Sequence, residues 1–120
     1  ATLFAATFSS STLAPWRTVG SLNGPMWRHQ LVAVNDQVHL FGGTAPMGPS
    51  FSVQTATTDD AGVFSSWSYG APMMFPRGSP QVVRVGSHLF VVGGRSFSLG
   101  SELDVETFFI EPTGALRRLP

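Results

Sequence analysis

The stretch Val38-His39-Leu40-Phe41-Gly42-Gly43 returns 51 residues later as Leu89-Phe90-Val91-Val92-Gly93-Gly94. Both copies are short apolar runs that end in two glycines, a residue that tolerates backbone angles closed to other residues. The same offset aligns further positions: Trp16 with Trp67, Leu22 with Met73, Pro25 with Pro76 and Val34 with Val85. A period of about fifty residues predicts a repeat protein, in which one unit cannot bury its apolar face without a neighbour.

Each repeat is predicted to contain four antiparallel strands. Two residues, Asn35-Asp36 or Gly86-Ser87, separate the first two strands of each repeat, which is typical of tight hairpins. No window combines a helical period with helix caps. Four short strands in about fifty residues describe one blade of a β-propeller. The predicted strands are residues 30–35, 38–42, 53–58 and 64–69, and then 81–85, 88–93, 104–110 and 115–119.

At these positions the sequence resembles the kelch-repeat family of β-propellers. Kelch repeats typically pair a Gly-Gly after the second strand with a Trp on the fourth, as Gly42-Gly43 and Trp67 do here. They often carry a Pro-Arg run ending in His before the first strand. Residues 25–29 (Pro-Met-Trp-Arg-His) keep its proline and histidine, and residues 76–80 (Pro-Arg-Gly-Ser-Pro) keep its proline and arginine. The resemblance implies an all-β fold of kelch-like blades, but such blades occur in scaffolds, adaptors, oxidases and sugar isomerases.

The repeat phase predicts a half-blade over residues 1–19, followed by blades over residues 20–70 and 71–120. Because propellers close with about four to eight blades, this organisation favours a segment of a larger propeller. Assembly of several copies into a ring-forming oligomer and an open or domain-swapped form are the alternatives. The repeat also predicts side chains buried between blades: Trp16, Trp67, Phe41, Val92, Val34 and Val85, with Met26–Trp27 and Met73–Phe75 packing beside them.

Composition narrows the classes of partner. The formal net charge is zero and the seven basic residues, all arginine, are scattered, which argues against a nucleic-acid partner. The absence of cysteine excludes disulfides, thiolate-ligated zinc and thiol catalysis within these residues. No apolar run approaches the roughly 18 residues that predict a membrane-spanning helix. The glycine pairs do not open helices, so no phosphate-binding loop and no cofactor are expected.

The three histidines, His29, His39 and His88, lack the spacing of metal ligands, and no metal site is predicted. His29 beside Arg28 is the best candidate for contacting a ligand or a partner loop. It precedes a first strand, and the kelch resemblance implies that first strands line the central channel. The alternative is that its imidazole satisfies backbone groups of the adjacent turn.

Three carboxylates alternate near the second Gly-Gly pair: Glu102, Asp104 and Glu106. Alternate residues of a strand share one face, so these side chains are predicted to lie together. Buried together, they could perform acid–base chemistry. Their place on an outer third strand instead predicts a solvated face.

The loops after the glycine pairs are the predicted binding elements. Residues 44–52 contain Met47 and Phe51, and residues 95–101 contain Arg95 and Phe97. Binding residues concentrate on loops held by a rigid scaffold, and exposed Met, Phe and Arg suit a protein interface. Phe51 and Phe97 folded back over the blade edges is the alternative.

Taken together, these patterns favour a non-catalytic propeller segment that binds protein partners or serves as a structural scaffold. Its expected partners are another protein or the remaining blades of a larger chain. Two alternatives stay open: a propeller that binds a small ligand or glycan, and part of a sugar-isomerising kelch enzyme. The compartment is not fixed by the sequence.

Overall fold

The computed structural model describes residues 2–9, 12–96, 100–101 and 104–120. Within these residues the secondary structure is all β, with no helix, as predicted. The strands are β1 (Thr2–Ala5), β2 (Phe8–Ser9), β3 (Thr12–Leu13), β4 (Arg17–Ser21), β5 (Gln30–Val34), β6 (Gln37–Phe41), β7 (Thr44–Ala45), β8 (Gly48–Pro49), β9 (Val53–Thr57), β10 (Ser68–Tyr69), β11 (Gln81–Val85), β12 (His88–Val92), β13 (Arg95–Ser96), β14 (Gly100–Ser101), β15 (Val105–Ile110) and β16 (Leu116–Arg118).

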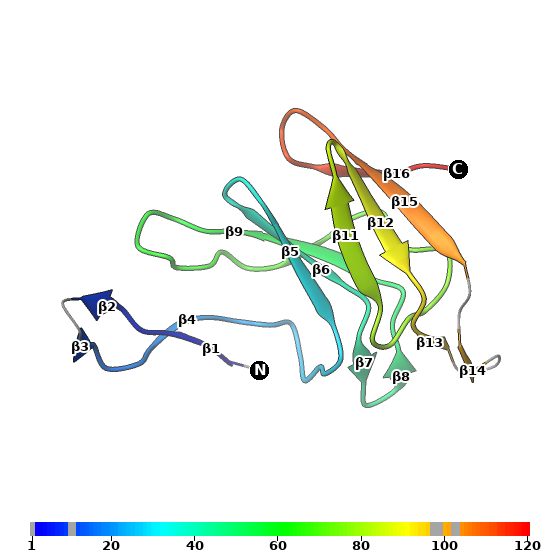
Figure 1. The fold of residues 1–120 in the computed structure, drawn as a ribbon. Coiled ribbons are helices and arrows are strands. Elements are labelled where there is room, and N and C mark those ends of the chain that lie inside the picture. The colour runs from blue at the N-terminus through cyan, green and yellow to red at the C-terminus, as the bar shows by residue number, and fades with distance from the viewer. Residues whose placement is uncertain (1, 10–11, 97–99, 102–103) are drawn as a thin grey trace.

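Two four-stranded antiparallel sheets follow the repeat (Figure 1). The first sheet has the order β5-β6-β9-β10 and the second the order β11-β12-β15-β16. Leu31 pairs with Leu40 in the first sheet, and the residues 51 positions later, Val82 and Val91, pair in the second. The strand order predicted for each blade is therefore confirmed.

The fourth strand of the first sheet is shorter than predicted, because only β10 pairs with β9 in regular register. Upstream of β10, the Thr57 N–H donates to the side-chain hydroxyl of Ser65 at 2.9 Å instead of to a backbone carbonyl. A single isolated bridge, Thr58 with Phe64, remains in this region. The serine hydroxyl thus interrupts the backbone ladder that the repeat alignment predicts.

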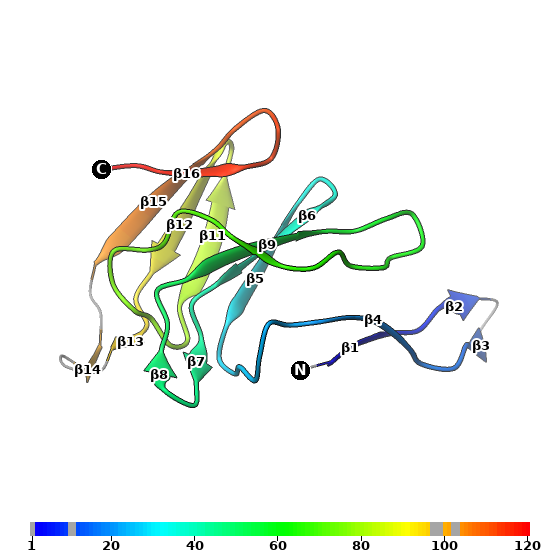
Figure 2. The same cartoon turned by 180° about the vertical axis from the view of Figure 1, so that it is seen from behind.

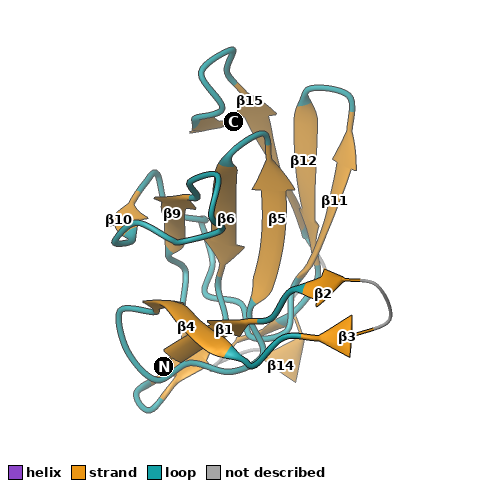
Figure 3. Ribbon diagram, turned by 90° about the vertical axis from the view of Figure 1, so that its left-hand side faces the viewer, coloured by secondary structure: helices purple, strands orange, loops and turns teal. Residues whose placement is uncertain are grey.

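At the N-terminal end, β1 and β4 form a two-stranded pair with the β2–β3 hairpin at its tip (Figures 1 and 2). Figure 3 looks from this end and shows the pair in front of both four-stranded sheets. The Phe64 N–H donates to the Val19 carbonyl at 2.8 Å, which joins β4 to the outer part of the first sheet. The chain therefore presents two strands, followed by two sheets of four.

Apolar side chains fill both of the spaces between these units. Between the two sheets, the rings of Phe41 and Phe108 meet edge to face with centroids 5.4 Å apart. The buried side chains around them are Val34, Val53, Met73, Leu89, Val91 and Ile110. Between the first sheet and the N-terminal pair, Trp67 stacks on Phe64 and packs with Leu40 and Ala56. Each pair of adjacent units thus shares an apolar core, as expected of repeats that cannot bury a face alone.

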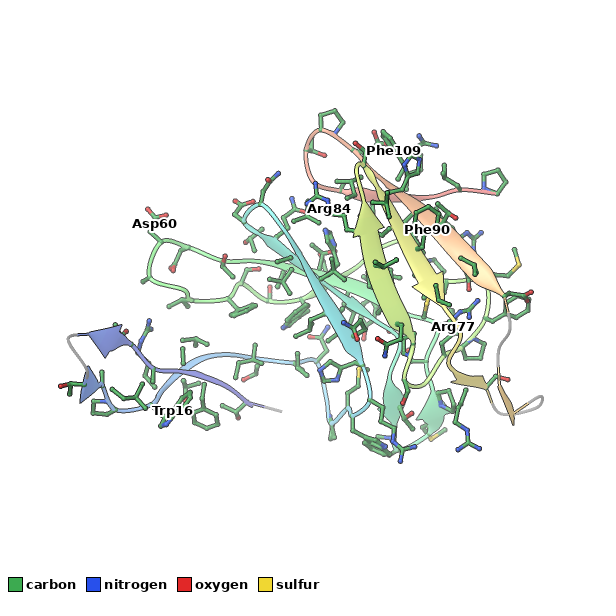
Figure 4. All side chains as sticks on the ribbon, viewed as in Figure 1. Trp16, Asp60, Arg77, Arg84, Phe90 and Phe109 are labelled. Atoms are coloured by element: carbon green, nitrogen blue, oxygen red, sulfur yellow. The ribbon has the colours of Figure 1, made fainter. Side chains whose placement is uncertain are left out.

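Three of the six predicted buried positions are confirmed, since Trp67, Phe41 and Val34 are each at most 6% exposed. The other three predictions are wrong: Trp16, Val85 and Val92 are 66%, 61% and 43% exposed. Trp16 points away from both sheets (Figure 4), and the two valines lie on the side of the second sheet opposite the first. In the described chain nothing covers these two outer faces, so the repeat position alone does not bury them.

The Gly42-Gly43 pair is a joint between the sheets. The Gly43 N–H donates to the Arg77 carbonyl at 2.9 Å, and a Cβ at Gly42 would collide with the same oxygen. Both glycines have positive φ, 58° and 96°, which other residues adopt at a cost. The repeated Gly-Gly therefore lets the segment that leads into the second sheet approach the end of β6.

Candidate protein-binding face

One end of the two sheets gathers the segments that the sequence singled out. It consists of the turns at residues 27–29 and 77–79 with the β7–β8 and β13–β14 hairpins, and we call it the loop face. Strands β7, β8, β13 and β14 lie together at the bottom of Figure 1, opposite the β5–β6 and β15–β16 turns. The hairpins were predicted only as loops.

Backbone hydrogen bonds fix the hairpins to the turns in the same way in both repeats. Trp27 and Thr44 exchange two bonds of 3.0 and 2.7 Å, and Gly78 and Arg95 exchange two bonds of 2.8 and 2.7 Å. These pairs are again 51 residues apart. The loop face is consequently built from hydrogen-bonded segments and not from free loops.

Further bonds join the two halves of the face. The Ser79 N–H donates to the Arg28 carbonyl at 2.8 Å, and the Arg77 N–H donates to the Ser50 carbonyl at 2.9 Å. A Cβ on Gly78 would approach the Thr44 hydroxyl to 2.7 Å, so the two repeats also meet closely there. The loop face is continuous across the boundary between the sheets.

Two non-glycine residues of this face have a left-handed backbone. Arg28 has φ 58° and Ser79 has φ 55°, and they are equivalent in the repeat. Such a conformation costs of order 1–3 kcal/mol and persists where the surroundings enforce it. Here the enforcing contact is the hydrogen bond between these two residues. Strain of this kind clusters at functional sites.

The structure places the predicted binding residues as follows. Met47 lies at the tip of the β7–β8 hairpin and is 90% exposed, and Phe51 follows the hairpin at 54% exposure. Phe51 therefore does not fold back fully over a blade edge. Arg28 and Arg95 are exposed and their backbones flank Gly78–Ser79. Phe97 lies outside the described residues.

His29 is half-buried behind the loop face, with its Cβ against Gly43. Its Nδ1 is buried and has no hydrogen-bond partner in the described part of the chain. The predicted alternative was that the imidazole satisfies backbone groups of the adjacent turn, and Nδ1 makes no such bond with the described residues.

Trp27 belongs to the face although the sequence predicted it to pack between blades. Its side chain is 47% exposed, while its neighbour Met26 does pack against the core around Trp67. The repeat alignment could have distinguished the exposed Trp27 from the packed Met26. Trp27 aligns with Gly78, so the second repeat has no side chain at this position to fill an interior space.

Arg77 positions the face from within. Its side chain is fully buried, and its guanidinium donates from Nε to Glu106 Oε2 at 3.0 Å, with Nη2 2.9 Å from the same oxygen. Nη1 donates to the carbonyls of Gly93 and Asp104 at 2.7 and 3.1 Å. One arginine thus binds the end of β12 and the start of β15.

The expectation of a solvated carboxylate face is wrong for Glu106. Besides the ion pair with Arg77, its carboxylate accepts the N–H groups of Met74 and Phe75. The Glu106 carboxylate turns inward because the buried guanidinium of Arg77 requires a paired charge. Asp104 remains exposed, and Glu102 lies outside the described residues.

His39 and His88 take structural places in the two sheets. His39 is buried between them, with Nδ1 2.8 Å from the Thr55 hydroxyl and Nε2 3.1 Å from the Gly114 carbonyl. Burial lowers the pKa of His39 below its usual 6.5, and the bond to Gly114 opposes this only in part. The His88 ring contacts Phe90 and Phe109 on the outer side of the second sheet.

Among the residues that the structure describes, no three His, Cys, Asp or Glu side chains converge as metal ligands. The same described residues also contain no helix that is long and apolar enough to cross a membrane. The chemistry that the loop face offers is therefore that of arginine, tryptophan and methionine side chains held on a fixed backbone.

The chain is similar to part of a known protein. The chain is 28% identical over 90 residues to beta-scruin of Limulus polyphemus, a kelch-repeat protein. The matched region covers 74% of this chain but only 9% of that protein's length. No family model matches the chain. The similarity is to a kelch-type protein and accords with the all-β repeat described above.

Proposed function

We propose that this chain is a segment of a kelch-like β-propeller that acts through protein contacts, as a binding surface or a structural scaffold, and catalyses no reaction. In this proposal residues 1–19 form a half-blade and residues 20–70 and 71–120 form blades. The main support is Met47, whose side chain is 90% exposed on a hairpin fixed by hydrogen bonds at its base. An apolar side chain held out on a rigid support is characteristic of protein-binding loops.

The two uncovered outer faces support the propeller part of the proposal. Large apolar side chains are exposed on each: Phe4, Leu13 and Trp16 at the N-terminal end, and Val83, Val85, Val92 and Val105 on the second sheet. Monomeric soluble proteins rarely expose large contiguous apolar patches. We assign both faces to contacts with the remaining blades of a larger propeller.

The second Gly-Gly pair fits this assignment. Gly94 has φ 107°, like its counterpart Gly43, but its N–H has no backbone partner among the described residues. In the first repeat the equivalent N–H binds the carbonyl of Arg77 in the next sheet. The Gly94 N–H would bind the corresponding carbonyl of a following blade.

The binding proposal is tested by affinity capture from cells that express the protein, followed by mass spectrometry. Met47→Ala and Phe51→Ala should reduce the amount of each specifically captured protein about tenfold, as interface truncations do. Thermal unfolding should be unchanged, because both side chains are exposed. The matched control is Met74→Ala, a methionine that is 63% exposed outside the loop face. Equal losses for Met47→Ala and Met74→Ala would contradict the proposal.

A further inference from the structure

The connector between the N-terminal pair and the first sheet, residues 22–29, contains the dipeptide Asn23-Gly24. In such a dipeptide the glycine nitrogen can attack the side-chain carbonyl carbon of the asparagine, because glycine has no Cβ that obstructs the approach. The attack closes a succinimide ring and releases ammonia. Water then opens the ring to aspartate or to isoaspartate, in which the main chain runs through Cβ. This chemistry needs no enzyme, so the local structure decides whether it proceeds.

The connector leaves room for this ring. Asn23 and Gly24 lie in a bend between Ser21 at the end of β4 and Gln30 at the start of β5. Asn23 is exposed, and a Cβ built on Gly24 would meet no atom beyond its chain neighbours within 4 Å. Both residues also line a cavity of about 200 Å³, which is large enough to hold water. The reacting groups are therefore accessible to water.

The attacking nitrogen differs between the two repeats. The Gly24 N–H makes no hydrogen bond with the described residues. Its equivalent 51 positions later, the Phe75 N–H, donates to the Glu106 carboxylate at 3.4 Å, and the neighbouring Met74 N–H donates to the same carboxylate. In the first repeat Gln54 takes the place of Glu106, and its oxygen accepts from a side chain instead. The first repeat thus lacks the contact that holds this peptide nitrogen in the second.

The Asn23 side chain fastens the connector to the first sheet. Its Nδ2 donates to Gln54 Oε1 at 2.9 Å and to the Trp67 carbonyl at 3.4 Å. Gln54 and Trp67 are both buried, at 4% and 6% exposure. On either side of Asn23, Leu22 and Met26 pack against the core around Trp67. Asn23 is therefore bound at the place where the N-terminal pair meets the first sheet.

We propose that Asn23 is a site of spontaneous deamidation, and that its conversion loosens the N-terminal pair from the first sheet. The Gly24 nitrogen bonds to Cγ of Asn23, the Cγ–Nδ2 bond breaks, and Nδ2 leaves as ammonia with the proton of the Gly24 nitrogen. Water opens the ring to a carboxylate. Gln54 can rotate its amide to donate to that carboxylate, but the Trp67 carbonyl can only accept and loses its donor. This proposal goes beyond the protein-binding function and does not depend on it.

The other asparagine of the chain, Asn35, provides an internal control. It is also exposed, but it lies in the two-residue turn between β5 and β6 and has φ 56°. The next residue is Asp36, whose side chain obstructs attack by its own nitrogen. The same sample of protein therefore contains one asparagine that should convert and one that should persist.

The first experiment incubates the purified protein in warm, mildly alkaline buffer, which favours loss of the Gly24 N–H proton. Peptide mass spectrometry detects the exchange of NH₂ for OH, and labelling by an isoaspartyl methyltransferase detects isoaspartate. Asn23 should convert at least about tenfold faster than Asn35, which corresponds to about 1.4 kcal/mol in the barrier.

Gly24→Ala is the matched variant. It should slow conversion of Asn23 by a similar factor without changing thermal unfolding, because the added Cβ enters open space and Gly24 does not have positive φ. Three outcomes would overturn the proposal: equal rates at Asn23 and Asn35, an unchanged rate in Gly24→Ala, and conversion of Asn23 in urea but not in the folded protein.

The second experiment tests the loosening by amide hydrogen exchange at Phe64. Its N–H donates to the Val19 carbonyl at 2.8 Å and reports the contact of β4 with the first sheet. Exchange at Phe64 should be roughly tenfold faster in converted protein and in Asn23→Asp, while exchange at the Val91 amide of the second sheet stays the same. Gly24→Ala incubated in the same way should exchange like fresh protein. If converted protein exchanges at Phe64 no faster than fresh protein, the proposed loosening is wrong.

Discussion

The side of the first sheet that faces the second differs sharply from the corresponding side of the second sheet. On the first, Val34, Phe41 and Val53 are 1%, 0% and 2% exposed. Their repeat equivalents Val85, Val92 and Val105 are 61%, 43% and 54% exposed. The residues and the strand register are alike, and only the neighbour is missing. Burial in a repeat protein is therefore decided by the adjacent unit, and not by the sequence of one repeat.

The segments that lead into the two sheets also differ at equivalent positions. Met26 packs against Gly43 in the first repeat, and Arg77 occupies the same place against Gly94 in the second. The equivalent residues on the third strand also differ: Gln54 is buried and accepts from the Asn23 side chain in the first repeat, and Glu106 pairs with Arg77 in the second. One repeat uses neutral side chains before its first strand and the other uses a buried ion pair.

The largest expected effect comes from exchanging these side chains. Arg77→Met should lower the free energy of unfolding by about 3–5 kcal/mol, because it leaves the Glu106 carboxylate without its buried partner. Arg77→Met/Glu106→Gln installs the residues of the first repeat and should recover more than half of that loss. Urea unfolding of the purified protein, followed by far-UV circular dichroism, measures both. If the double variant is less stable than Arg77→Met, the neutral pair of the first repeat cannot replace the ion pair of the second.

A loss of stability of intermediate size is expected from a pair of variants that compares the covered side of the first sheet with the uncovered side of the second. Val34→Ala removes buried methyl groups and should lower the free energy of unfolding by about 2–3 kcal/mol. Val85→Ala makes the same chemical change at the equivalent position and should alter it by less than about 0.5 kcal/mol. The same unfolding experiment measures both variants. Similar losses would mean that the Val85 face is covered in solution, by a second copy of the chain.

The smallest expected effect concerns His39, which lies between the sheets, and depends on pH. Because burial lowers the pKa of His39, the unfolded chain takes up a proton on this side chain at a higher pH than the folded protein does. Stability should be constant above the unfolded value of 6.5 and fall as pH drops below it, towards the lowered folded pKa. His39→Gln should flatten this part of the stability–pH curve. An unchanged slope in that variant would assign the pH dependence to other groups.

The sequence predicted some residues of the candidate site and missed others. Loop position and residue type predict Met47, Phe51, Arg28 and Arg95, and all four are exposed at one end of the sheets. They do not predict Trp27, because a tryptophan beside an apolar methionine indicates packing. The ion pair of Arg77 with Glu106 also escapes prediction, since these residues are 29 positions apart on different elements. Sequence patterns find exposed loops better than they find pairings between distant segments.

By itself, the sequence determined the repeat period, the order and antiparallel pairing of the four strands in each sheet, and the glycine pairs that end the second strands. These features depend on short-range physics: alternation along a strand, two-residue turns and backbone angles that glycine permits. The tertiary structure alone decided which repeat positions are buried, that Glu106 turns inward, and that the backbone carbonyls of Arg28 and Arg95 accept hydrogen bonds from Ser79 and Gly78. Each of these depends on which surfaces come into contact when one sheet packs on the next, and residues far apart in the chain supply those surfaces.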